Sequence, residues 1–219
     1  MDLLRQHEIF EIEVLDWLSS FRLLEPLVFG GGTMLRLCHE LKRYSVDLDF
    51  WFVREVQEQD FFSRTRNLLQ KEYEITDAQN KHYTMLLELR SPHYPKRLKI
   101  EIRKGTKTWD FQEKIAFSRF STRQVLLKTL TLEQSMANKV AAFLDREEIR
   151  DCFDIEFLLR RGIKLPPLEH QSLQRFQNKL GKFKQADFKV KLGSILEEDM
   201  RRYYISQGFS YLQEKLQST

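Results

Sequence analysis

Residues 26–52, PLVFGGGTMLRLCHELKRYSVDLDFWF, hold the clearest changes of hydrophobic period in the chain. The apolar run Pro26 to Phe29 predicts a short strand. After three glycines and Thr33, apolar residues recur at i, i+3, i+4 and i+7, which is one face of an amphipathic helix: Met34, Leu37, Cys38 and Leu41. From Val46 to Phe52 apolar and polar positions alternate, which predicts a strand with one buried face.

The remaining pattern separates a mixed region from a helical one. Helical spacing recurs at 1–24 and 60–70, and strand patterns at 82–90, 98–103 and within 115–130. From Thr131 the pattern is helical up to Gly162, a plausible C-cap, and Pro166-Pro167 marks a break before a polar, helical tail. We therefore expect an α+β part with a mixed sheet over residues 1–130 and a helical C-terminal part over 131–219.

Composition is that of a globular protein of 219 residues, with 42% hydrophobic and 31% charged residues. No apolar run reaches membrane-spanning length, and the N-terminus has no signal-peptide layout. Cys38 and Cys152 give neither a disulfide framework nor zinc spacing, and both lie in apolar helical patterns, so we expect buried free thiols. These features predict a cytoplasmic protein without a membrane segment.

The formal net charge is only +4, but one segment of the chain is strongly basic. Residues 172–193 hold a single acid, Asp187, among six basic residues and three phenylalanines. A basic surface near aromatic rings is typical of nucleic-acid binding. The alternative is a solvated helix face whose phenylalanines pack inward, and the sequence leaves both interpretations open.

The glycine turn and the strand after it predict a phosphate and metal site. Glycines before a helix let backbone N–H groups approach an anion, and Thr33 stands where an N-cap or a phosphate-binding hydroxyl would be. Asp47 and Asp49 share one strand face, and a divalent cation would relieve their repulsion. The alternative is an exposed strand face with two solvated aspartates after an ordinary turn.

Further charged residues are candidates with their own alternatives. Glu101 lies on the polar face of the strand at 98–103 and would complete a carboxylate trio if that strand lies beside the Asp47 strand; otherwise it is a surface acid between two cations. Lys139 lies off the apolar face of its helix and would neutralise triphosphate charge if it stands beside the phosphate pocket. Otherwise Lys139 is solvated, and Arg150 pairs with Asp154 at i, i+4 on the surface.

Three segments together resemble the AbiEii/AbiGii-type nucleotidyltransferase toxins of type IV toxin–antitoxin and abortive-infection systems, and are similar to the MenT toxins. They are FGGGTMLRLCHELKRYSVDLDF, SMANKVAAFLDRE and IRDCFDIEFLL, in matching order and spacing across residues 28–160. The resemblance implies a polymerase-β-like nucleotidyltransferase core followed by a helical part. It also implies transfer of a nucleotide from an NTP, with Mg²⁺ or Mn²⁺, onto an acceptor such as the 3′ end of tRNA, and an antitoxin partner.

The resemblance also assigns roles by position. Gly31, Gly32 and Thr33 would hold phosphates, and Arg36 and Ser45 would shape the loop. The metal ligands would be Asp47 and Asp49, with Glu101 carried over only as the third carboxylate of the wider fold. Lys139 would hold the nucleotide phosphates, Asp151 would be the late acid and Asp154 would support it.

Two other functions remain open from the sequence. One is a non-catalytic module of the same fold that binds nucleotide or RNA, against which the intact pair Asp47 and Asp49 argues. The other keeps the chemistry but uses a small-molecule acceptor, as antibiotic-modifying nucleotidyltransferases do. The basic segment 172–193 favours RNA over a small molecule.

Overall fold

The computed structural model describes residues 2–105 and 107–217, which divide into two compact units. The first unit extends to Glu40 and resumes over Tyr44–Leu130, and the second comprises Leu41–Arg43 together with the described residues from Thr131 onward. The assignment of a nucleotidyltransferase core to residues 1–130 and a helical subdomain to 131–219 stays a prediction.

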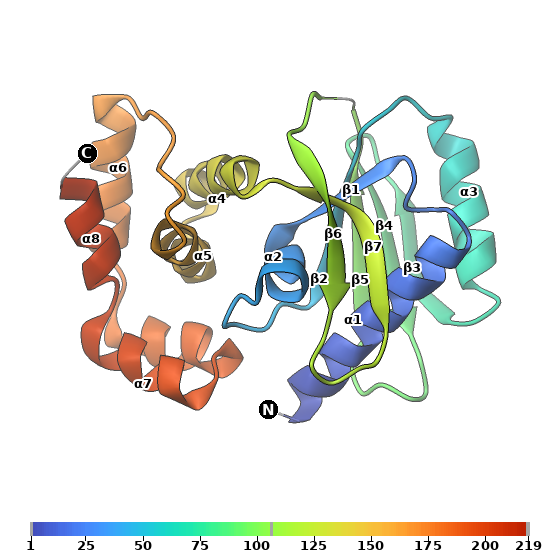
Figure 1. The fold of residues 1–219 in the computed structure, drawn as a ribbon, viewed down its shortest axis with the longest axis horizontal. Coiled ribbons are helices and arrows are strands. Elements are labelled where there is room, and N and C mark those ends of the chain that lie inside the picture. The colour runs from blue at the N-terminus through green and yellow to red at the C-terminus, as the bar shows by residue number, and fades with distance from the viewer. Residues whose placement is uncertain (1, 106, 218–219) are drawn as a thin grey trace. The chain divides into compact units, whose positions relative to one another are not determined.

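The first unit is built on a mixed sheet of seven strands in the order β3-β4-β5-β2-β1-β7-β6 (Figure 1). The central strand β2 is antiparallel to β1 and parallel to β5, and β1 is parallel to β7. The strands are β1 (Leu27–Gly30), β2 (Asp47–Phe52), β3 (Glu74–Asn80), β4 (Thr84–Arg90), β5 (Leu98–Arg103), β6 (Phe111–Phe117) and β7 (Gln124–Leu130).

The predicted alternation in β2 is confirmed. Its apolar residues Leu48, Phe50 and Phe52 are at most 2% exposed, whereas every second residue between them is half-buried. Strand β5 repeats this pattern beside it, because the apolar side chains of both strands pack into one core while the polar ones face the other way. The two polar faces therefore form one continuous surface across the centre of the sheet.

Three helices accompany this sheet: α1 (Asp2–Ser20), α2 (Gly31–His39) and α3 (Glu58–Leu69). Helix α1 packs on β5 and β7, α2 on β2 and β6, and α3 on β3 (Figure 1). The predicted helix at 1–24 ends earlier, at Ser20, and a turn that includes Arg22 at φ 58° leads into β1. Strand β3 was not predicted, because none of its side chains is fully buried and no alternation of apolar and polar residues marks it.

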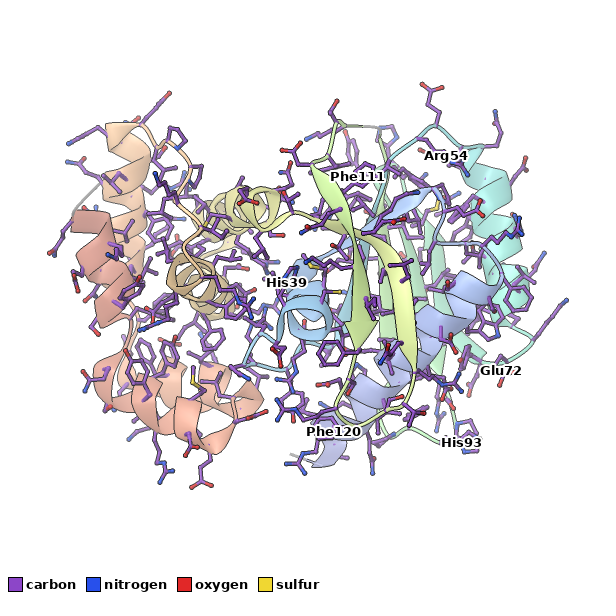
Figure 2. The ribbon with its side chains drawn as sticks, viewed as in Figure 1. His39, Arg54, Glu72, His93, Phe111 and Phe120 are labelled. Atoms are coloured by element: carbon purple, nitrogen blue, oxygen red, sulfur yellow. The ribbon has the colours of Figure 1, made fainter. Side chains whose placement is uncertain are left out.

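The edge strand β6 exposes apolar side chains. Phe111, labelled in Figure 2, is 45% exposed, and Ile115 and Phe117 follow on the same side of the strand. Their cross-strand neighbour Leu126 in β7 is 62% exposed.

The second unit is helical, as predicted. It contains α4 (Leu132–Arg146), α5 (Ile149–Arg160), α6 (His170–Leu180), the π-helical η1 (Asp187–Leu192), the 3₁₀ turn η2 (Gly193–Ile195), α7 (Glu198–Gln207) and α8 (Ser210–Gln217). Thr131 caps α4 by accepting a hydrogen bond from the Gln134 N–H at 3.2 Å. The Gln134 side chain bonds to Asn138 instead, so the predicted capping box is only half formed. Gly162, at φ +85°, follows the end of α5.

A buried acid fastens the tail of the second unit to α5. Glu156 is fully buried and accepts hydrogen bonds from the Tyr204 hydroxyl at 3.0 Å and the Leu212 N–H at 3.2 Å. Arg160 pairs with the same carboxylate from the next turn of the helix. Helices α6 and α8 lie side by side in this unit (Figure 1). Over the described residues, no helix combines the length and apolarity needed to cross a membrane.

Candidate functional site

The glycine turn joins β1 directly to α2. Gly30 ends the strand in an extended conformation and serves as N-cap, and Gly31 begins the helix at φ +73°. A Cβ atom on Gly31 would lie 2.2 Å from Asp49 Oδ2. Only a glycine therefore fits between the start of α2 and this carboxylate, because both the backbone conformation and the space exclude a side chain.

This close approach predicts the effect of adding one methyl group. We expect Gly31→Ala to lower the free energy of unfolding by more than Gly105→Ala. Both positions have positive φ, so an alanine at either carries a strain of about 1–3 kcal/mol, but a Cβ on Gly105 meets nothing within 4 Å. Only Gly31→Ala should also weaken nucleotide binding, since it displaces Asp49. Denaturant unfolding and calorimetric titration measure the two effects, and equal losses in both variants would contradict this account.

Asp47 and Asp49 lie together on the half-buried face of β2. The register places Asp49 between Gly30 of β1 and Glu101 of β5, and Asp47 beside Lys99. The Lys99 ammonium lies 3.7 Å from Asp47 Oδ2, so part of the negative charge is already balanced. The Asp49 carboxylate thus lies at the start of α2, and Asp47 shares its strand face.

Thr33 has a different role from the two that its position suggested. The N-cap is Gly30, which places Thr33 in the first turn of α2. Its side chain is fully buried, and its hydroxyl donates a hydrogen bond of 2.6 Å to the carbonyl oxygen of Asp47. Thr33 therefore ties the start of the helix to the start of β2, and its hydroxyl does not face an open pocket.

Glu101 meets the condition set for it, since β5 lies beside β2 and Glu101 stands opposite Asp49. Its carboxylate lies 3.7 Å from Lys99 and 3.6 Å from Arg103. Within residues 2–105 and 107–217, no group of three or more Asp, Glu, His or Cys side chains is arranged to hold a metal ion. The role of Glu101 as a third metal ligand therefore stays a prediction.

Two titratable groups of α1, His7 and Glu11, are buried near the start of β2. His7 donates a hydrogen bond of 2.9 Å to the Val46 carbonyl, and burial lowers the pKa of His7. Glu11 is buried, and desolvation, followed by the nearby charges of Glu8 and Asp47, raises its pKa well above the usual value. Burial therefore disfavours the charged form of both groups.

Arg36 and Ser45 frame the loop between α2 and β2. Arg36 is buried, donates to Glu8 at 2.8 Å and lies over the ring of Tyr44 at 4.3 Å. The Ser118 hydroxyl donates to the other oxygen of Glu8 at 2.6 Å. Ser45 is half-buried next to Tyr44. The arginine therefore anchors the loop through α1, and its predicted place at the nucleotide stays a prediction.

The predicted residues of the second unit form a buried ionic cluster. Lys139 Nζ lies 2.6 Å from Asp154 and 3.4 Å from Asp151, and Arg146 pairs with Asp151 at 2.7 Å. Arg43 pairs with Asp154 at 2.6 Å through two nitrogens. Both aspartates are fully buried.

This cluster excludes the alternative interpretations of two residues. Lys139 is not solvated but only 9% exposed, because its acceptors lie on the neighbouring helix α5. Asp154 bonds to Arg43 and Lys139 rather than to Arg150, which is exposed. Sequence reasoning missed Arg43, since 111 positions separate it from its partner.

The predicted site residues thus fall into two groups. Gly31, Asp47, Asp49 and Glu101 come together in the first unit, and Lys139, Asp151 and Asp154 in the second. The first group fits a magnesium ion, which proteins usually hold through one or two carboxylates plus substrate phosphates. All its donors are oxygens, and Gly31 keeps the helix start beside Asp49 clear of side chains.

Comparison with known proteins identifies the family. The family model described as nucleotidyl transferase AbiEii toxin, type IV toxin–antitoxin system, matches residues 14–207. The fold resembles the nucleotidyltransferase toxin MenT4 from Mycobacterium tuberculosis H37Rv, with 18% identity, a TM-score of 0.50 and coverage of 87% of this chain and 72% of that one. A Helicobacter pylori protein assigned as a nucleotidyltransferase gives 16% identity, a TM-score of 0.51 and coverage of 95% and 96%. No curated protein sequence matches.

The sheet and its helices therefore define a nucleotidyltransferase-type fold, and the predicted fold class is confirmed. The chain belongs to the AbiEii family of nucleotidyltransferase toxins from type IV toxin–antitoxin systems.

Proposed function

We propose that this protein transfers a nucleotide from an NTP to the 3′ end of an RNA, with tRNA as the expected acceptor, in a reaction that requires Mg²⁺. The observation that carries this proposal is the Asp49 carboxylate held against Gly31, at the point where β1 turns into α2. This arrangement sets acidic oxygens beside the positive end of a helix dipole.

The glycine turn binds the triphosphate of the NTP. The first backbone N–H groups of α2, at Gly31 and Gly32, have no partner within an α-helix, and the N-cap residue Gly30 has no side chain to bond them. They donate to phosphate oxygens, which the glycines allow to approach closely. Thr33 holds this turn in place through its bond to Asp47.

Asp47 and Asp49 would hold the metal ion that the reaction requires. When bound, Mg²⁺ neutralises the phosphate charge and orients the triphosphate for transfer. Lys99, 3.7 Å from Asp47, limits the repulsion between the two carboxylates while no cation is present. Glu101 is the third carboxylate of this group, opposite Asp49.

We assign Lys139 to the nucleotide phosphates and Asp151 to the late acid of the family motif, on the resemblance of their segments. The cluster in the second unit supports a positioning role for Asp154, because its bonds to Arg43 and Lys139 fix both cations. Arg36 and Ser45 shape the loop between α2 and β2.

An RNA acceptor is supported by the surface of residues 172–193. Five of its basic side chains are exposed, whereas Phe176 is fully buried and Phe183 and Phe188 are half-buried. The phenylalanines therefore pack inward, and the segment offers charge for phosphates rather than rings for bases. The exposed residues are Arg175, Lys182, Lys184, Lys189 and Lys191.

A transfer assay tests the proposal. The purified chain is incubated with total RNA and each radiolabelled NTP in turn, with and without Mg²⁺. We expect label to enter RNA, with tRNA dominating, and EDTA to stop the transfer. The absence of label in RNA with all four NTPs, while the chain still binds nucleotide, would exclude RNA as the acceptor and leave a non-catalytic module or a small-molecule acceptor.

The toxin role has its own expected result. Because the family belongs to toxin–antitoxin systems, we expect expression of the chain to arrest growth and the product of a neighbouring gene to reverse the arrest. Growth arrest that persists in a variant without transfer activity would separate toxicity from the chemistry proposed here.

A further inference from the structure

Trp51 continues the line of Asp47 and Asp49 along β2. Alternation along the strand puts all three side chains on the same half-buried face. The indole covers the N-cap of α2, since a Cβ atom on Gly30 would lie 2.4 Å from Trp51 Cζ3. A glycine at position 30 therefore makes room for this ring beside the glycine turn.

The surroundings of Trp51 combine aromatic and cationic groups. Arg103 stands opposite Trp51 in the parallel pair of β2 and β5, and its guanidinium lies 5.7 Å from the centre of the indole. The Arg103 side chain is 55% exposed. Trp109 lies with its ring centroid 5.5 Å from that of Trp51, at an angle of 57°. Large rings and a planar cation are the groups on which proteins stack bases.

Trp109 supplies a second, independent observation. Its indole nitrogen is buried and has no hydrogen-bond partner among the residues that the structure describes. A buried donor without a partner costs free energy, and such groups in native proteins call for an explanation.

We propose that Trp51 and Arg103 form a stacking site for a nucleobase next to the carboxylates of β2. The base comes either from the donor NTP or from the 3′-terminal nucleotide of the acceptor. This inference rests on the proposed function, because the stacking site would be part of the same nucleotide-transfer site. It gives the first unit the aromatic contact that the basic segment 172–193 does not provide.

The test compares ligands with and without a base. Calorimetry of the full chain with Mg²⁺ gives the Kd of an NTP and of inorganic tripolyphosphate, and a separate titration without NTP uses an unstructured RNA oligonucleotide. Loss of one stacked base weakens binding about tenfold to a hundredfold. We expect this loss in Trp51→Leu for the ligand whose base is stacked, while tripolyphosphate affinity stays unchanged and Trp51→Phe recovers most of the binding.

The matched control is Trp17→Phe on α1, which should leave every Kd as in the wild type. A loss for the NTP alone identifies the donor base, and a loss for RNA alone identifies the acceptor base. The proposal is overturned if Trp51→Leu binds NTP and RNA like the wild type, or if it loses tripolyphosphate to the same extent, which would indicate a packing role. Because binding needs no turnover, a chain that stacks bases but transfers no nucleotide would refute the proposed function alone.

Discussion

Asp49→Asn is expected to reduce nucleotide transfer by about a thousandfold or more, because the amide removes the charge that holds the metal at the glycine turn. The change keeps the size of the side chain and its place against Gly31. It also removes one of two like charges on the same strand face, so the fold should be retained. The rate of label transfer from NTP to RNA at saturating Mg²⁺ measures the effect.

The matched control for this variant is Asp60→Asn, since Asp60 is an exposed carboxylate on α3 of the same unit. It should transfer nucleotide at the rate of the wild type. Asp47→Asn should approach the loss seen for Asp49→Asn. Transfer by Asp49→Asn at more than a tenth of the normal rate would show that this carboxylate is not a metal ligand.

The largest effect on stability is expected for Asp154→Asn. The carboxylate is fully buried between Arg43 and Lys139, and both cations would remain buried after its charge is removed. Breaking a buried ion pair from one side costs about 3–5 kcal/mol. Denaturant unfolding followed by circular dichroism measures the loss. Tryptophan fluorescence would not report on the second unit directly, because the tryptophans at 17, 51 and 109 all lie in the first unit.

The lowered pKa of Asp154 also determines how stability is expected to depend on pH. Burial alone raises the pKa of Asp154, but the charges and hydrogen bonds of Arg43 and Lys139 outweigh it, so the folded pKa lies below the usual value. A carboxylate with a lowered folded pKa stabilises the protein above its unfolded pKa of about 3.9, and this contribution is lost as the pH falls through the folded pKa.

Unfolding of the wild type should therefore become easier below about pH 4, and the profile should be flatter in Asp154→Asn. Asp145→Asn, a change to an exposed acid on α4, is the control and should follow the wild type. A variant at position 154 that keeps the full acid sensitivity of the wild type would assign that sensitivity to other carboxylates.

Local patterns predicted the centre of the sheet well. In β2 and β5 one face is packed into the core and the other is not, so burial imposes a period of two that the sequence shows directly. The glycine turn before α2 was predicted, but the helix begins at Gly31 rather than after Thr33, and the positive φ at Gly31 is a conformation that glycine allows. Strand β3 has no fully buried side chain and hence left no such signal.

Long-range polar contacts could not be predicted. The hydroxyl of Thr33 meets a carbonyl 14 positions away, and Lys139 meets carboxylates on another helix. A helical pattern distinguishes apolar from polar positions, but it cannot show that a polar residue is buried with a partner. Trp51 follows the alternation along its strand, yet the groups around it come from three other segments.

The short segment Leu41–Arg43 has a consequence for dissecting the protein. These residues belong to the second unit. The chain therefore crosses from one unit to the other three times: between residues 40 and 41, between 43 and 44, and between 130 and 131. A fragment cut after Leu130 would carry Arg43 without its carboxylate, and the complementary fragment would carry Asp154 with only part of its counter-charge. Separate expression of the two halves should thus yield poorly folded products, whereas co-expression should restore their solubility.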